Sequence, residues 1–283
     1  MFKGSQPTDG GNLVLTANEK AELISKEPLA EKYIKAFWGA DEFLYSRERY
    51  CLWLKEIEPN VLKNLRLVQS RIEQVKKSRF KSPTPSVQDF AKYPALFTQD
   101  RQPKENYLAL PEVSSENRNY VPVGFLTPDI ICSNKLQIIP NAGMYIFGIL
   151  SSKIHNTWIK YVSGRLESRI SYSPAVYNNY PFPQNTTNKQ IMTIETAAQK
   201  VLDARLQFPN SSLADLYDPL TMPPALVKAH NELDKAVDLA YRPQPFTSEA
   251  NRMVFLFELY EKYTADLFTK EKPKKKGKSV WKV

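Results

Sequence analysis

Hydrophobic and polar positions follow two different patterns along the chain. Up to about residue 183, short apolar runs bounded by turn residues alternate with helical stretches, and such runs are typical of strands. We predict strands at 13–15, 50–54, 107–110, 120–126, 130–132 and 137–139. From residue 184 onward apolar residues recur every three or four positions, which is typical of amphipathic helices. The pattern predicts an α+β fold, in which a mixed α/β domain with short strands precedes a small all-helical domain.

The helical stretches have recognisable starts. Thr16 is an N-cap candidate for a helix over 18–25, with Glu19 placed to complete a capping box. A helix is also predicted over 151–162, whereas 144–150 fits either a strand or a helix. Three helices are expected after residue 184, over 191–206, 223–240 and 247–267.

A basic amphipathic helix is predicted between residues 63 and 81. Its buried stripe is expected to consist of Leu65, Val68, Ile72 and Val75. Its cations are Lys63, Arg66, Arg71, Lys76, Lys77, Arg79 and Lys81. A solvated face is the ordinary explanation for such a cluster, but Glu73 is the only acid within it, and we therefore predict contacts with phosphates.

Charge and composition narrow the class of protein. The formal net charge is +9, but seven lysines and one glutamate from Lys270 onward supply six of these charges. Residues 271–283 are expected to form a basic, disordered tail. No run of eighteen apolar residues exists, the N-terminus lacks a signal-peptide core, and the two cysteines lie among apolar neighbours. These features predict a cytoplasmic protein with reduced thiols and no membrane partner.

Catalytic motifs are absent from the sequence. It contains no Gly-x-Gly phosphate cradle, no Gly-x-Ser-x-Gly, and only two histidines, neither of them in a His-Glu-x-x-His frame. Pro128-Asp129 could begin a metal nuclease motif, but no acidic residue two positions before a lysine follows it. We therefore expect no catalysis by this chain alone, and no bound metal or cofactor.

The segment from Gly164 to Ser173 carries the most informative chemistry. Glu167 and Arg169 stand two positions apart among small polar residues. A carboxylate can accept from the cytosine amino group and an arginine can grip guanine O6 and N7, so one pair could read a G·C base pair. A plain surface ion pair is the alternative. The aromatic, proline-locked turn over 176–183 favours a segment held in place for reading.

The chain resembles the C-terminal part of MmeI-like enzymes. Matching segments include Gly-Ser-Gln-Pro-Thr-Asp-Gly-Gly at 4–11, Arg-Tyr-Cys-Leu-Trp-Leu at 49–54, the stretch 111–126, Gly-Arg-Leu-Glu-Ser at 164–168 and Val-Tyr-Asn-Asn-Tyr-Pro-Phe-Pro at 176–183. Shorter matches lie at 133–134, 139–140, 147–152 and 155–158. They occur in family order over roughly residues 1–270.

The resemblance implies a domain plan and a partner. It implies an N-terminal extension or linker over 1–39, a target recognition domain over 40–183 and a C-terminal helical domain over 184–270. In such enzymes an S-adenosylmethionine-dependent N6-adenine methyltransferase lies upstream with an Asn-Pro-Pro-Tyr tetrapeptide that this sequence lacks. The expected partners are double-stranded DNA and a methyltransferase domain or subunit, supplied upstream or in trans.

The resemblance also assigns base-reading positions. These are Glu167 and Arg169 as a pair, Ser171 beside them, and Lys135 just past Ser133-Asn134. Many relatives carry arginine where Ser171 stands, so base choice there is expected to differ. Arg118 joins the predicted phosphate contacts. Two other functions stay open: a module that docks a methyltransferase subunit with incidental DNA contact, and RNA binding through the fifteen tyrosines.

Overall fold

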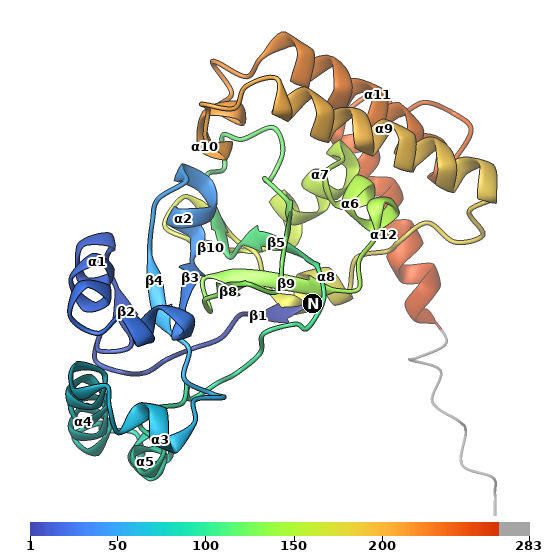
Figure 1. Cartoon of the computed structure of the whole chain (residues 1–283). Coiled ribbons are helices and arrows are strands. Elements are labelled where there is room, and N and C mark those ends of the chain that lie inside the picture. Colours follow the sequence, from blue (N-terminus) through green and yellow to red (C-terminus); the bar gives the residue numbers. More distant parts are fainter. Residues whose placement is uncertain (266–283) are drawn as a thin grey trace, which may run out of the picture.

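The computed structural model describes residues 1–265, and the predicted basic tail lies outside them. A mixed part, residues 1–183, contains the strands, and a helical part, residues 184–265, covers one side of it (Figure 1). The predicted α+β fold, with a helical C-terminal region, is confirmed. Among the described residues, no helix combines the length and the apolar composition that crossing a bilayer requires.

Three small sheets build the mixed part. The first, antiparallel throughout, has the order β1 (Phe2–Lys3), β9 (Leu136–Pro140), β5 (Tyr107–Pro111) and β7 (Gly124–Leu126). The second has the order β2 (Val14–Leu15), β4 (Tyr50–Leu52), β3 (Ile34–Trp38) and β8 (Ile130–Cys132), with β3 and β8 parallel. The third has the order β10 (Gly164–Leu166), β11 (Arg169–Ser171) and β6 (Val113–Ser114).

The prediction of a linker over residues 1–39 is wrong. Phe2 pairs with Ile138 across β1 and β9, and the Gly4 N–H donates to the Leu136 carbonyl at 3.0 Å. Leu13 and Leu15 are completely buried, because β2 completes the second sheet beside β4. The segment therefore supplies edge strands to two sheets and part of a core.

Helices pack around the second sheet (Figure 1). These are α1 (Ala17–Lys26), the 3₁₀ helix η1 (Pro28–Tyr33), α2 (Ala40–Tyr45), α3 (Pro59–Leu62), α4 (Arg66–Phe80), α5 (Pro85–Asp89) and the 3₁₀ helix η2 (Phe90–Lys92). The predicted capping box of α1 is present, with Thr16 and Glu19 each accepting from the other's backbone N–H. Glu27 accepts from the N–H groups of Leu67 and Val68 and so caps α4.

Helices α6 (Met144–Leu150) and α7 (Lys153–Val162) lead from the sheets toward the helical part. Residues 144–150 are therefore helical, which settles the ambiguity of their pattern. The predicted strand over 120–126 is wrong for its first half: only Gly124 to Leu126 pair with β5. Residues 120–123 are bound by side chains of the helical part instead of a neighbouring strand.

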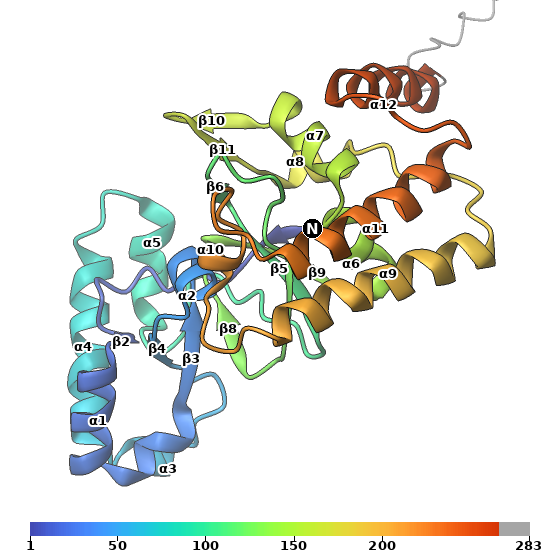
Figure 2. The same ribbon diagram turned by 90° about the horizontal axis from the view of Figure 1, so that it is seen from above.

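The helical part is built on a pair of long helices. Its elements are α9 (Asn188–Leu206), α10 (Leu213–Leu216), α11 (Pro224–Tyr241) and α12 (Glu249–Thr264), and the short α8 (Pro174–Asn178) precedes it. Helices α9 and α11 lie side by side over α6 and α7 (Figure 2). One apolar core crosses the boundary, since Phe147 and Trp158 belong to the same cluster as Val201 and Leu233. The two parts are therefore held together by burial of a shared core.

Candidate nucleic-acid interface

The segment that carries Glu167 and Arg169 is a two-stranded hairpin. Strands β10 and β11 pair Leu166 with Arg169 and Gly164 with Ser171, and Glu167 and Ser168 form the turn. Side chains two residues apart on a strand share a face, so Arg169 and Ser171 point to the same side. The Ile170 side chain points to the other side and is 2% exposed. In the sheet, Ile170 pairs with Ser114 of β6. The hairpin thus presents two predicted base-reading residues on one face.

Glu167 and Arg169 form an exposed ion pair at the tip of this hairpin. The Arg169 Nη2 donates to Glu167 Oε2 at 2.9 Å, and the two side chains are 49% and 79% exposed. Exposed pairs of this kind contribute only about 0–1 kcal/mol to stability. Both groups are therefore free to exchange their mutual contact for base edges at little energetic cost.

The backbone of Glu167 is strained. Its φ of +57° lies in the left-handed region, which costs a residue with a Cβ roughly 1–2 kcal/mol. Glycine is the residue that a tight turn of this kind normally uses at such a position. A strained glutamate at an exposed tip is more readily explained by a function of its carboxylate than by stability.

Lys135 lies beside this hairpin although it is 36 positions from Ser171 in the sequence. The link runs through Glu112: its N–H donates to the Lys135 carbonyl at 3.0 Å, and its carbonyl accepts from the Tyr172 N–H at 2.7 Å. Val113, the next residue, pairs with Ser171. Lys135 and Glu112 also line a hollow of about 250 Å³ together with Gly39, Asp41 and Arg49.

Arg118 belongs to the same edge. It follows β6 in an irregular loop, and its Nη1 donates to Ser114 Oγ at 3.4 Å. Ser114 pairs with Ile170 of the hairpin. Glu116 of the loop lies 3.6 Å from Arg165 of β10. The fold therefore links the hairpin, which carries three predicted base-reading residues, to Lys135 through Glu112 and to Arg118 through Ser114.

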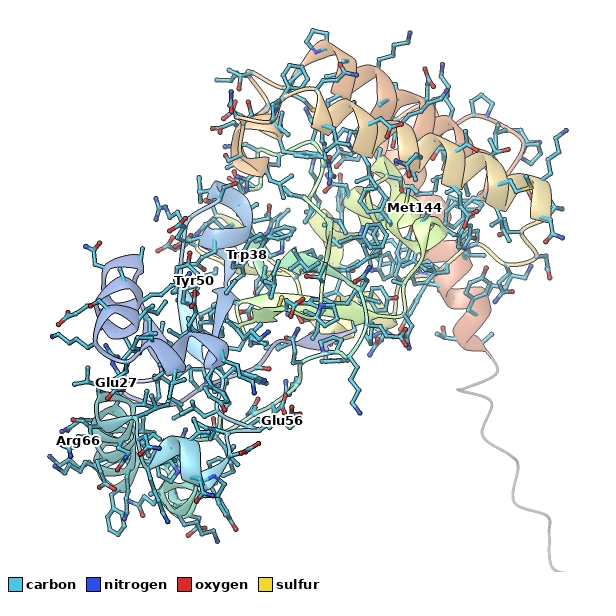
Figure 3. The ribbon with its side chains drawn as sticks, viewed as in Figure 1. Glu27, Trp38, Tyr50, Glu56, Arg66 and Met144 are labelled. Atoms are coloured by element: carbon cyan, nitrogen blue, oxygen red, sulfur yellow. The ribbon has the colours of Figure 1, made fainter. Side chains whose placement is uncertain are left out.

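The basic helix presents a second cationic surface. Val68, Ile72 and Val75 of α4 are buried as predicted, and five cations are exposed: Lys63, Arg66, Lys76, Lys77 and Lys81. Within residues 1–265 none of the five forms an ion pair with a carboxylate. Lys63 lies in the short turn between α3 and α4 instead of on the helix. Figure 3 shows Arg66 on the outer edge of the molecule, far from Met144 of α6.

The prediction that Arg79 contacts phosphate is wrong. Arg79 is 1% exposed, and its guanidinium donates to the carbonyls of five residues: Pro7, Thr8, Phe90, Tyr93 and Leu96. Burial lowers the pKa of this guanidinium. The spacing that buries Val68, Ile72 and Val75 continues to residue 79, so the same pattern could have predicted this burial.

Arg71 is also committed to internal contacts, which contradicts its predicted phosphate contact. Its Nη2 lies 2.6 Å from Glu19 Oε1, and its Nη1 donates to the Asn12 carbonyl at 3.0 Å. The pKa of Glu19 is lowered, first by the Thr16 N–H and then by Arg71. Arg71 thus fixes α4 to α1 and to the turn before β2.

Two family models match nearly the whole chain. "MmeI, target recognition domain" matches residues 1–184 and "MmeI, C-terminal domain" matches residues 186–268. The chain belongs to the MmeI family. The first match begins at residue 1, in agreement with the pairing of β1 and β2 inside the sheets.

Two relatives of this MmeI-family chain are informative. DNA methyltransferase A of Bacillus subtilis (strain 168) is 39% identical over 262 residues, which cover 92% of this chain and 30% of that protein. The solved structure of the type IIL restriction-modification enzyme MmeI in complex with DNA is 45% identical, with a TM-score of 0.91. That match covers 93% of this chain and 35% of the enzyme. The chain spans about a third of the length of either relative.

Sequence reasoning missed two cations at the hairpin edge of this MmeI-family chain. Arg165 of β10 is 44% exposed, and its Nη2 donates to the Lys160 carbonyl at 3.0 Å. Lys3 of β1 is 42% exposed and lies 2.5 Å from Glu112 Oε1. Its place in the segment 164–173 could have indicated Arg165. Nothing in the sequence predicted β1, so Lys3 could not be placed.

Proposed function

We propose that this chain reads base sequence in double-stranded DNA for a DNA adenine methyltransferase of a restriction-modification system. Glu167, Arg169, Ser171 and Lys135 contact base edges in this proposal. Arg118, together with the exposed cations of α4, neutralises phosphates and sets the register of the protein on the duplex. The chain itself takes no part in methyl transfer.

One observation carries the proposal. The residues predicted to read bases come from two segments separated in sequence, yet the backbone of Glu112 and Val113 links Lys135 to the end of β11. The carboxylate, guanidinium, hydroxyl and ammonium of these residues match the donors and acceptors that base edges present in the major groove. The family's DNA-bound structure, at 45% identity, supports the same function.

The catalytic partner is part of the proposal as well. The two relatives named above are a DNA methyltransferase and a restriction-modification enzyme, and both are about three times longer than this chain. We propose that a methyltransferase domain, linked upstream or supplied in trans, holds S-adenosylmethionine and acts in the cytoplasm on the site that this chain selects. Among residues 1–265 no three potential metal ligands cluster together.

Selection of duplexes from a random-sequence pool tests the proposal. The wild-type chain should enrich one sequence pattern, and Arg169→Ala should lose preference at one base pair by about 1–3 kcal/mol. Ser171→Arg should change the preferred base at a neighbouring position, because an arginine there can grip guanine bidentately.

Arg165→Ala is the matched control. It removes the same charge from the same hairpin, but Arg165 pairs with Ile170 and lies on the opposite face from Arg169. We expect it to weaken binding to all duplexes without changing the enriched pattern. If Arg169→Ala enriches the wild-type pattern unchanged, the base-reading role is wrong. If the wild-type chain enriches no sequence pattern and duplex binding depends only on residues beyond 265, the proposal of base reading is wrong. The alternative, a module that docks a methyltransferase subunit, then replaces it.

A further inference from the structure

The loop that carries Arg118 has two differently bound sides. Residues 115–123 connect β6 to β7 without regular structure. Residues 115–118 lie beside the hairpin, where Arg118 contacts Ser114 and Glu116 contacts Arg165. Residues 119–123 face the helices, and Tyr120, Val121 and Val123 are buried in the core that both parts share.

A buried carboxylate of the helical part holds the centre of this loop. Asp234 of α11 is 7% exposed, and its Oδ2 accepts from the Tyr120 hydroxyl at 2.7 Å. Its Oδ1 accepts from the Lys153 N–H, at the first turn of α7, also at 2.7 Å. One side chain of α11 therefore fixes both the loop and the start of α7.

A second set of polar contacts reaches the same loop. Arg205 of α9 donates from Nη1 to the Val123 carbonyl at 2.7 Å and from Nε to the Tyr217 hydroxyl at 2.9 Å. The Tyr217 hydroxyl lies 2.8 Å from His230 Nε2, and the His230 ring stacks on the Tyr120 ring with centroids 4.0 Å apart.

These polar contacts are not needed simply to fill the core. Apolar side chains of similar volume could fill the same space without the desolvation of several polar groups. Asn156 of α7 adds a further directed contact, from its Nδ2 to the Asn119 carbonyl at 2.7 Å. Directed bonds at Asn119, Tyr120 and Val123 fix the position of the backbone that leads to Arg118. Apolar packing alone would fix it less tightly.

We propose that Asp234 and Tyr120 are positioning residues. Through them the helical part holds the Arg118 loop where the Arg118 guanidinium can contact a DNA phosphate. The inference rests on the proposed function and assigns the helical part an indirect role in DNA binding. Neither residue touches DNA in this proposal. Their effect is transmitted by the short backbone segment between Tyr120 and Arg118.

The salt dependence of binding to a random-sequence duplex tests this role. Each phosphate contact contributes about 0.9 to the slope of log affinity against log salt concentration. Arg118→Ala should lower the slope by about that amount, and Tyr120→Phe, which removes one hydroxyl, should lower it equally. The double variant should show no further loss, because both changes remove the same contact. Hydrogen exchange of residues 115–119 should also accelerate in Tyr120→Phe.

Asp238→Asn is the matched control. Asp238 pairs with Arg252 at 2.6 Å, and both side chains are largely buried in the helical part; within residues 1–265 neither side chain forms a hydrogen bond or ion pair with the loop. The variant should be destabilised and keep the wild-type slope and the wild-type exchange of residues 115–119. If Tyr120→Phe does not fold at the assay temperature, Asp234→Asn provides the same test from α11, because an asparagine keeps only one of the two acceptor oxygens.

The outcomes separate the inference from the proposed function. A folded Tyr120→Phe with the wild-type slope overturns the positioning role and leaves base reading by the hairpin untouched. An equal loss of slope in Asp238→Asn also overturns it, since any destabilisation would then have the same effect. A wild-type chain that binds no duplex overturns both proposals.

Discussion

Helix α4 and the loop that carries Arg118 both present cations at the surface, and a buried charge supports each from behind. Behind α4 the charge is Arg79, whose guanidinium donates to five backbone carbonyls. Behind the loop it is Asp234, whose carboxylate accepts from one hydroxyl and one backbone N–H. A buried charged group held by hydrogen bonds is thus used in both places, with opposite signs.

The difference lies in how each charge responds to pH. An arginine keeps its charge at any pH that a folded protein tolerates, so the support of α4 does not titrate. Burial raises the pKa of Asp234 to about 6, although the hydrogen bonds from Tyr120 and Lys153 oppose the shift. Only the support of the Arg118 loop therefore changes its protonation state near neutral pH.

The largest effect is expected from Arg79→Ala. The substitution leaves five carbonyls in a buried site without their donor, and breaking a buried charged network of this kind costs about 3–5 kcal/mol. Urea unfolding should show this loss. Lys77→Ala, on the exposed side of the same helix, should stay within about 0.5 kcal/mol of wild type. Equal effects of the two changes would contradict the internal role of Arg79.

Asp234→Asn should change how stability depends on pH. The folded-state pKa of Asp234 is raised above the unfolded value, so its contribution to stability is full below about pH 4 and is lost as pH rises through about 6. A pKa raised to about 6 in the folded state corresponds to about 3 kcal/mol. The free energy of unfolding of wild type minus that of Asp234→Asn should therefore fall by about 3 kcal/mol between pH 4 and pH 7. Parallel stability curves from pH 4 to pH 7 would exclude the titration of Asp234.

These two residues also mark where sequence reasoning succeeds and where it stops. The periodicity of Val68, Ile72 and Val75 predicted α4 and its buried face. The same periodicity includes Arg79, although its charge by itself indicates a phosphate contact. Charge reports what a side chain can bind, whereas position on the helix decides whether a partner can reach it.

The site was predictable as a set of residues but not as a surface. Glu167, Arg169 and Ser171 lie on one hairpin, so their sequence spacing placed them together. Lys135 joins them only through hydrogen bonds to Glu112, which are long-range contacts that local pattern does not contain. Residues 120–123 had the pattern of a strand, yet contacts with α9 and α11 hold them as a loop. The edge strands β1 and β2 are so short that their pairing depends on tertiary structure.

Glu167→Gly should separate base reading from folding at the hairpin. Glycine relieves the positive φ, worth roughly 1–2 kcal/mol, but loses about 0.5–1 kcal/mol through the greater freedom of the unfolded chain. The free energy of unfolding should therefore be unchanged or rise by up to about 1.5 kcal/mol, while preference at the base pair read with Arg169 falls. Thermal unfolding and duplex selection measure the two effects. A marked loss of stability would show that the carboxylate serves the fold.

The smallest effects on stability are expected from the exposed lysines of α4. Lys76→Ala and Lys77→Ala should each leave stability within about 0.5 kcal/mol, because neither side chain has an ion pair within residues 1–265. If these lysines contact phosphates, each change should lower the salt slope of duplex binding by about 0.9. The sequence pattern enriched from a random pool should stay that of wild type, since phosphates carry no base identity.

Arg169→Ala provides the contrast for these lysines, because it should change the enriched pattern as well as the affinity. A lysine variant with the wild-type slope would identify α4 as an ordinary solvated surface and leave phosphate binding to the hairpin edge alone. A lysine variant that alters the enriched pattern would instead place α4 close to the bases. Helix α4 and the hairpin would then both read bases, which would contradict the proposal that α4 only contacts phosphates and sets the register on the duplex.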